Sequence, residues 1–158
     1  MFKFLNTHSV WSKYTVKLKK NISQKFYDKY REQGCSLDNV RHLIAVEGDK
    51  EEWGTPDWML ELANEFPSSM HLLDSISIEF GRSELDIYCK GQYSFHNFAK
   101  LLDVLSPYIK EGFLGYSILT QHCVILVYLA EGKLHFINPE NLNLDHKFSI
   151  TMESNKND

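Results

Sequence analysis

The hydrophobic residues of this chain recur with two different periods, and the change between them divides the sequence into a helical part and a strand part. A repeat every three to four residues is typical of a helix with one buried face, and strict alternation is typical of a strand. The helical repeat covers 22–33, 36–48 and 55–66 in the first part of the chain. In the second part only 94–109 keeps it, and three helices followed by a mainly stranded region are therefore predicted.

Capping residues and prolines indicate where these helices begin and end. Ser23 is placed to cap the first helix, and Thr55 followed by Pro56 favours the start of the third. Pro107 is expected to interrupt the helix over 94–109 after Leu105, because proline cannot donate the hydrogen bond that a helix interior needs.

Strands are predicted wherever the apolar residues alternate with polar ones. The segments 75–80 and 85–90 alternate strictly on either side of a Gly-Arg-Ser turn, which indicates a hairpin, and a second turn is expected at Gly91. Three further strands are predicted over 113–119, 122–130 and 133–137. The middle one of these is almost continuously apolar and is expected to be a central strand covered on both faces.

These elements together predict a single α+β domain over residues 1–150. N-terminal helices precede a mainly antiparallel sheet of about five strands, in the order β-β-α-β-β-β, with the helix over 94–109 packed on one face. Before the helices, 13–19 alternates and is expected to be a strand or an extended arm. The polar residues 151–158 are expected to form a disordered tail.

Composition agrees with one globular domain, and charge is distributed unevenly along it. The chain has 158 residues, of which 43% are hydrophobic, and a formal net charge of −4. Residues 1–33 hold eight basic and two acidic residues, whereas 34–158 hold nine basic and 19 acidic ones. Such a split indicates either a nucleic-acid-binding arm on an acidic body or two mutually attracting faces of one domain.

Cysteine usage and the N-terminus favour the cytoplasm. Cys35, Cys89 and Cys123 are odd in number and far apart, which argues against a disulfide framework and suits a reducing compartment. Cys89 and Cys123 fall in apolar strand patterns and are expected to be small buried residues. The sequence lacks the apolar run of a signal peptide and any stretch of the length that a membrane span needs, so no membrane partner is expected.

No motif for a chemical reaction stands out. The seven histidines have no metal-ligand spacing, and His122 and Cys123, as neighbours in a strand, point to opposite faces and cannot act as base and nucleophile. Phosphate-binding glycine loops and serine nucleophile motifs are also missing from the sequence. No metal, cofactor or catalytic residue is therefore predicted. A small enzyme whose active site has no recognisable sequence motif stays an alternative.

Two acidic patches are the candidate binding residues, because carboxylates around exposed aromatic residues suit a cationic protein partner. The first comprises Glu47, Asp49, Glu51, Glu52, Trp53 and Asp57. The second comprises Glu79, Glu84 and Asp86 on the polar side of the first hairpin. The simpler interpretation of the first patch is a solvated loop anchored by its tryptophans.

A nucleic-acid-binding module is a further alternative, although a nucleic-acid partner is not the expected one. It depends on the basic N-terminal segment, where lysines supply charge and tyrosines supply stacking surfaces. The lysines are Lys17, Lys19 and Lys20, and the tyrosines are Tyr14, Tyr27 and Tyr30. The net negative charge of the remaining chain opposes phosphate.

Residues 115–138, GYSILTQHCVILVYLAEGKLHFIN, resemble the long terminal hairpins of the immunity proteins of bacterial toxin systems, such as contact-dependent growth inhibition and other polymorphic toxins. A small acidic α+β chain without a catalytic motif is also similar to them. The resemblance implies tight binding to a cognate toxin domain, often a nuclease, whose active site is thereby blocked. The acidic body of the chain predicts that this toxin domain is basic.

Overall fold

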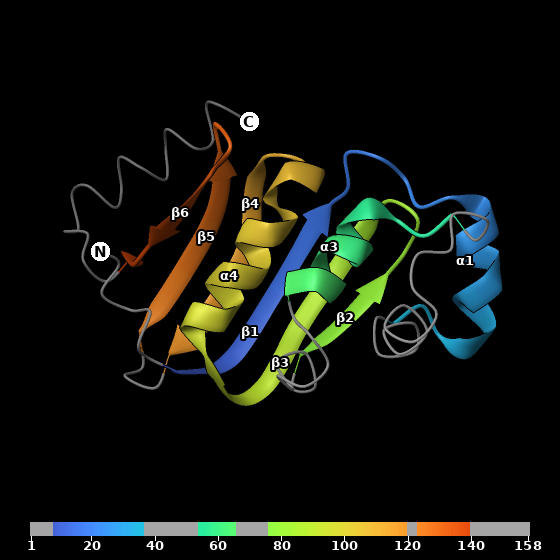
Figure 1. Cartoon of the computed structure of the whole chain (residues 1–158). Coiled ribbons are helices and arrows are strands. Elements are labelled where there is room, and N and C mark those ends of the chain that lie inside the picture. Colours follow the sequence, from blue (N-terminus) through green and yellow to red (C-terminus); the bar gives the residue numbers. More distant parts are fainter. Residues whose placement is uncertain (1–7, 37–53, 66–75, 120–122, 140–158) are drawn as a thin grey trace.

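The computed structural model of the chain describes residues 8–36, 54–65, 76–119 and 123–139, and these form a sheet with two α-helices over one face and a third beyond one edge (Figure 1). The strands are β1 (His8–Lys17), β2 (Ser77–Phe80), β3 (Glu84–Ser94), β4 (Gly112–Leu119), β5 (Val124–Ala130) and β6 (Lys133–Ile137). The helices are α1 (Gln24–Tyr30), α3 (Asp57–Glu65) and α4 (Phe95–Leu105). All described strand pairings are antiparallel, and the predicted α+β class is confirmed.

The segment predicted as a strand or an arm is the central strand β1. The sheet order is β2-β3-β1-β4-β5-β6, so β1 pairs with β3 on one side and with β4 on the other. The sheet therefore has six strands rather than about five, and a strand precedes the helices. Tyr14, Val16 and Leu18 are buried on the helix side, and backbone neighbours on both edges satisfy the polar groups of this strand.

The hairpin predicted over 75–90 is confirmed, but the turn predicted at Gly91 is not. β2 pairs with β3, and β5 pairs with β6 across a two-residue turn in which Glu131 has φ 54° and Gly132 has φ 75°. Positive φ at both turn residues matches the right-handed twist of the flanking strands. Gly91 lies inside β3, which continues to Ser94 and pairs with the start of β1.

The helices begin and end close to the predicted residues. The Ser23 hydroxyl accepts a hydrogen bond from the Phe26 amide at 3.2 Å and caps α1, while α3 begins at Asp57, immediately after Pro56. After Leu105 the chain tightens into a short 3-10 helix that contains Pro107, as predicted. Most of the predicted helix over 36–48 and the tail over 151–158 lie outside the described residues. No helix in the described part of the chain has the length and hydrophobicity to cross a membrane.

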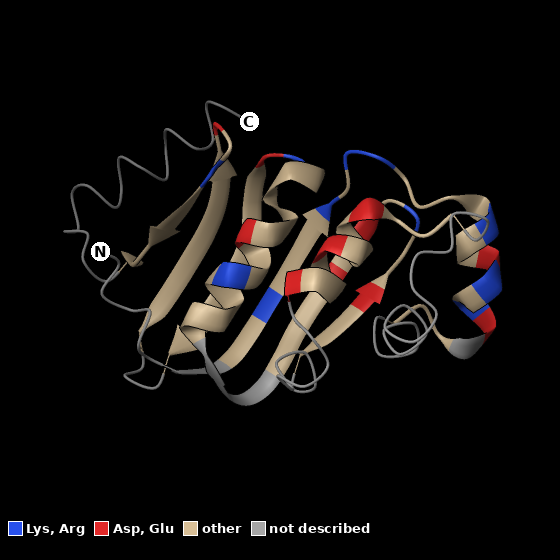
Figure 2. Cartoon of the chain, viewed as in Figure 1, with Lys and Arg blue, Asp and Glu red and all other residues tan. Residues whose placement is uncertain are grey.

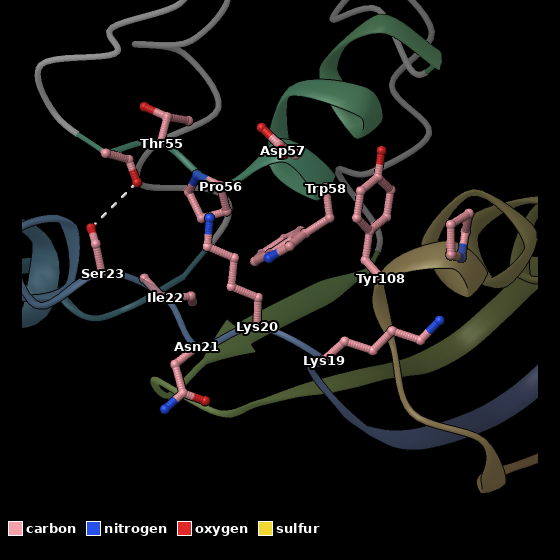
Figure 3. Close-up of a pocket in the computed structure, with 12 residues that line it drawn as sticks. Lys19, Lys20, Asn21, Ile22, Ser23, Thr55, Pro56, Asp57, Trp58 and Tyr108 are labelled. Atoms are coloured by element: carbon pink, nitrogen blue, oxygen red, sulfur yellow. Dashed lines mark hydrogen bonds between the residues drawn. The ribbon is translucent and has the colours of Figure 1, made fainter.

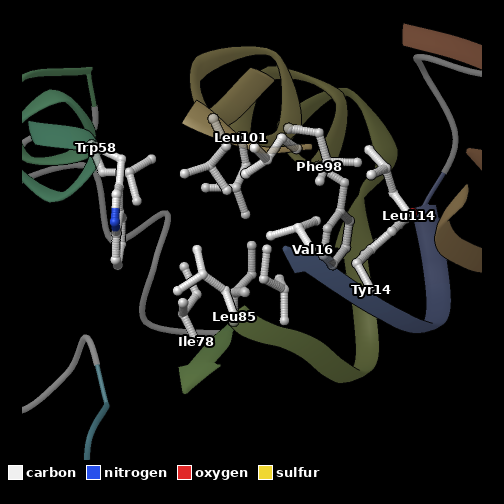
Figure 4. Packing of buried hydrophobic residues seen from close by; sticks show 14 of the residues in the cluster. Tyr14, Val16, Trp58, Ile78, Leu85, Phe98, Leu101 and Leu114 are labelled. Atoms are coloured by element: carbon white, nitrogen blue, oxygen red, sulfur yellow. The ribbon is translucent and has the colours of Figure 1, made fainter. Parts of the chain in front are cut away.

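One hydrophobic core joins α3 and α4 to one face of the sheet (Figure 4), and α1 contributes Phe26 and Tyr30 to it from beyond the β2 edge. The Phe98 ring of α4 lies 5.8 Å from the ring of Tyr14. The rings of Phe26 in α1 and Trp58 in α3 lie 5.9 Å and 6.5 Å from that of Phe80 in β2. Cys89 and Cys123 are buried in this core, as expected.

The prediction that the apolar strand over 122–130 is covered on both faces is wrong. Ile125, Val127 and Leu129 of β5 are buried, but the residues between them are only half-buried. β5 lies one position from the edge of the sheet, and no described helix covers its second face. Aliphatic residues here reflect β propensity on a partly exposed face rather than double burial.

Three hydroxyl groups are buried together where β1 meets β4. The Ser12 and Ser117 hydroxyl oxygens lie 2.6 Å apart, and the Tyr14 hydroxyl is hydrogen-bonded to Ser117. Burial raises the pKa of Tyr14 far above its usual value, although its hydrogen bonds to Ser117 and Ser12 partly oppose this. Because each hydroxyl has a partner, the cost of desolvating these polar groups is offset.

A close backbone approach at Gly115 makes the β1–β4 pairing possible. Gly115 has φ 151°, and a Cβ atom there would lie 2.2 Å from the carbonyl oxygen of Lys13. A side chain at this position would therefore clash with the backbone of β1.

We expect Gly115→Ala to lower the free energy of unfolding by about 3 kcal/mol or more, measured by chemical denaturation. Gly132→Ala is the matched control, because its φ is also positive but no atom lies within 4 Å, and it should cost about 1 kcal/mol. Equal losses in the two variants would contradict the steric explanation.

The buried Tyr14 hydroxyl predicts a specific alkaline instability. Because the folded pKa of Tyr14 lies above the unfolded value, its stabilising contribution is complete below about pH 10 and is lost as the pH rises further. Tyr14→Phe should cost about 1 kcal/mol at pH 7, and its decline in unfolding free energy above pH 10 should be shallower than that of the wild type. Tyr27→Phe, which keeps the Tyr14 hydroxyl, should retain the full decline. Parallel curves for Tyr14→Phe and the wild type would refute this role.

Candidate functional site: the open face of the sheet

The face of the sheet opposite the helices displays the second set of alternating side chains, and we call it the open face. Those of its members whose burial is described are exposed or half-buried. From β2 to β6 they form three bands: an acidic band on β2 and β3, a lysine band on β1, and an apolar and aromatic band on β4, β5 and β6. No helix in the described part of the chain packs on this face (Figure 1).

The acidic band brings the second predicted patch together. Glu79, Glu84 and Asp86 all point to the open face, and Glu79 lies directly opposite Asp86 in the β2–β3 register. None of the three carboxylates forms an ion pair with a described residue. Like charges that face each other across two strands destabilise a sheet, so this arrangement works against stability.

Two hydrogen bonds hold these facing carboxylates in place. The Thr15 hydroxyl donates to Asp86 at 2.9 Å, and the Tyr88 hydroxyl donates to Glu79 at 2.8 Å. The bond to Glu79 is the main cause that raises the pKa of Tyr88, with smaller contributions from burial and from the negative charge of Glu79. Both carboxylates are therefore fixed and accept hydrogen bonds, but their negative charge remains available to a partner.

The lysine band separates the acidic strands from the aromatic ones. Lys13 and Lys17 are exposed on β1, with Lys17 opposite Glu84 and Lys13 between Tyr88 and Tyr116 in register. The open face thus changes across the sheet from acidic to basic to aromatic rather than being uniformly acidic. Such banding favours one orientation of a bound protein over others.

The aromatic band occupies the other half of the open face. The rings of Phe113 and Tyr128 lie 5.1 Å apart, and the Trp11 indole N–H donates to the Tyr116 hydroxyl at 3.3 Å. Phe113 is 53% exposed and Ile137 is 39% exposed, the largest exposures of big hydrophobic side chains among the described residues. Exposed aromatic residues that are already held by their neighbours lose little conformational freedom on binding.

The structure separates Asp57 from the second patch. Asp57 begins α3 on the helix side of the sheet, where it forms a row with Glu61 and Glu65 at intervals of four residues (Figure 2). Glu79, Glu84 and Asp86 lie on the opposite side, so one flat partner cannot contact both groups. The remaining members of the first patch, Glu47, Asp49, Glu51, Glu52 and Trp53, lie outside the described residues.

The stacking surface of the nucleic-acid alternative is mostly buried. Tyr14 and Tyr30 are 0% and 2% exposed in the core, so the prediction that they offer stacking surfaces is wrong. Their rings alternate with exposed lysines because each lies on the inner side of an amphipathic element. Only Tyr27 of the three is partly exposed.

Two cysteine thiols of the described residues have raised pKa values. Burial raises the pKa of the Cys35 thiol by more than the positive charge of nearby Arg31 lowers it. Burial also raises the pKa of the Cys89 thiol. A raised pKa disfavours the reactive thiolate. In the described residues no three His, Cys, Asp or Glu side chains lie close enough to hold a metal ion.

The charge of the described surface differs from that of the sequence. The whole chain has 17 basic and 21 acidic residues, but in the described ranges Lys and Arg are about as numerous as Asp and Glu. The acidic character of the described surface is therefore local, on the open face and on α3.

The aromatic band was missed by reasoning from the sequence. The signal in the sequence is the alternation of inward and outward residues along each strand. Tyr116 lies between buried Gly115 and Ser117, and Tyr128 lies between buried Val127 and Leu129, so both tyrosines point away from the core. This alternation indicates exposed tyrosines only when one face of the sheet is known to be uncovered, and the sequence alone does not show which face that is.

Removing one of the facing charges should stabilise the protein. We expect Asp86→Asn to raise the free energy of unfolding by up to about 1 kcal/mol at low salt, with a smaller gain at high salt. Glu84→Gln is the matched control, because Glu84 faces Lys17, and it should leave stability unchanged or slightly lower it. A loss of stability in Asp86→Asn would show that its hydrogen bond to Thr15 outweighs the repulsion.

The chain matches no protein-family model, no curated protein and no solved structure in comparisons of sequence and fold. Its function is therefore inferred from the chemistry of its surfaces.

Proposed function

We propose that this protein binds a basic protein domain through its open face and neutralises it, as an immunity protein neutralises a cognate bacterial toxin, in the cytoplasm. The observation that carries the proposal is the facing pair Glu79 and Asp86, two fixed carboxylates that no described cation neutralises. A lysine or arginine of a partner would remove their mutual repulsion on binding. The repulsion that destabilises the free protein would be relieved in the complex, and its relief would add to the binding free energy.

The aromatic band supports the same function. Binding energy in protein interfaces concentrates on a few aromatic residues that lose their contact with water. Phe113, Tyr116 and Tyr128 lie beside the lysine band, on the same face as the carboxylates. Charged groups would steer and orient the partner, and the aromatic residues would supply the affinity. The similarity of residues 115–138 to immunity-protein hairpins is consistent with this, since those residues contain β5 and β6.

The first experiment isolates the partner and maps the face it uses. The wild-type protein is used to capture its partner from the cells that encode it, and association is then measured with the purified pair. Changing Glu79, Glu84 and Asp86 together to Lys should slow association about tenfold or more at low salt and reduce its salt dependence. The partner should be basic and toxic when expressed alone, and co-expression of the wild-type protein should restore growth.

The α3 row supplies the matched control. Asp57, Glu61 and Glu65 changed together to Lys introduce the same charge on the helix side and should leave association within about twofold of the wild type. If this variant slows association while the open-face variant does not, the interface lies on the helix side and the proposal fails. A partner that is acidic or harmless would also overturn it.

A further inference from the structure

A cavity of about 370 Å³ lies between the connection from β1 to α1 and the start of α3 (Figure 3). The first wall is Lys19, Lys20, Ile22 and Ser23; the second is Thr55, Pro56 and Trp58, with Tyr108 at one end. Its size lies at the lower end of the range for small-molecule sites, and its lining mixes apolar surface with a few polar groups, as such sites do.

Backbone hydrogen bonds fix the first wall on both sides. The Lys19 amide donates to the Tyr108 carbonyl at 2.9 Å, and the Ile22 amide donates to the Arg82 carbonyl at 2.7 Å. The Arg82 guanidinium in turn donates a hydrogen bond to the Ile22 carbonyl at 3.1 Å. Both lysines therefore lie on a stretch of the connection that backbone hydrogen bonds anchor on two sides, which preorganises the cavity.

The second wall is joined to the first at Gly54. The Ser23 hydroxyl donates to the Gly54 carbonyl at 3.4 Å, and a Cβ atom on Gly54 would lie 2.5 Å from that hydroxyl oxygen. Gly54 also has φ 71°, a conformation that favours glycine. The approach of the two walls therefore depends on this glycine.

A buried donor without an acceptor lines the cavity. Trp58 is only 3% exposed, and its indole N–H has no hydrogen-bond partner among the described residues. The ring lies in the middle of the lining residues, with its nitrogen on the side of Ile22 and Lys20 (Figure 3). A buried donor left unpaired is destabilising, so it points to an acceptor that the ligand supplies.

The start of α3 adds further donors beside this indole. The amides of Met59 and Leu60 donate to the Pro56 carbonyl at 3.1 Å and 3.2 Å, and the amides of Asp57 and Trp58 have no acceptor in the described structure. Unpaired amides at a helix start and the helix dipole favour an anion. The Asp57 side chain points away from the indole ring (Figure 3), which places a bound anion on the lysine side of the cavity.

We propose that this cavity binds a small organic anion, a carboxylate or phosphate on an aromatic or aliphatic body. Lys20 and the Trp58 indole N–H hold the acid group, Lys19 adds positive charge at the Tyr108 end of the cavity, and Ile22, Pro56 and the indole ring contact the body. The proposal is independent of the open face, because the two sites share no residue. A charge-assisted hydrogen bond from lysine to an oxyanion supplies both affinity and selection for negative charge.

The experiment follows the indole N–H directly. Proton–nitrogen NMR spectra of the full chain are recorded during titration with benzoate, phenyl phosphate, benzyl alcohol and benzylamine. Trp58→Phe keeps an aromatic ring and assigns the Trp58 indole signal among those of the three tryptophans. At least one of the two anions should shift this signal in a saturable way, with a Kd of about a millimolar or below, and the ratio of their affinities identifies the acid group.

Paired variants separate a built site from general attraction of anions. Lys19→Ala with Lys20→Ala should weaken anion binding about tenfold or more, while Lys25→Ala on the exposed side of α1 should leave it unchanged. The proposal is overturned if neither anion shifts the Trp58 signal, if benzyl alcohol or benzylamine binds as tightly as the anions, or if the lysine pair has no effect.

Discussion

The pairing of β1 between β3 and β4 is the constraint on which the remaining structure depends. The strands on either side are formed by residues close in sequence, β2 with β3 and β4 with β5 and β6, and these pairs are local hairpins. β1 comes from the other end of the chain and joins the two groups into one sheet. The junction requires a backbone approach at Gly115 that no other residue allows without strain.

The two sides of β1 have opposite chemistry, and this separates the core that stabilises the fold from the face that we propose binds a partner. On the helix side, Tyr14 and Val16 are buried in the core and Tyr14 carries the hydrogen-bonded hydroxyl group. On the other side, Lys13 and Lys17 divide the acidic band from the aromatic band. The facing carboxylates of Glu79 and Asp86 oppose stability, and the proposed binding of a cationic partner accounts for their presence.

Local periodicity predicted most of the described elements but not their arrangement. The hairpins, the Ser23 cap and the break at Pro107 follow from neighbouring residues, and so does the grouping of Glu79, Glu84 and Asp86. The central place of β1 depends on pairing with residues about 70 to 110 positions away, which no local pattern encodes. For the same reason, the separation of Asp57 from the acidic band and the cavity between Lys20 and Trp58 are visible only in the fold.

Amide hydrogen exchange of the unbound protein tests the place of β1 most directly. If β1 holds the two groups of strands together, its central amides, over 12–16, exchange only when the whole protein unfolds. Their exchange free energy should equal the free energy of unfolding from denaturation and should match the slowest amides of β3 and β4. Exchange in β1 at a clearly lower free energy than in β5 would contradict the account, because the first strand would then leave a sheet that persists without it.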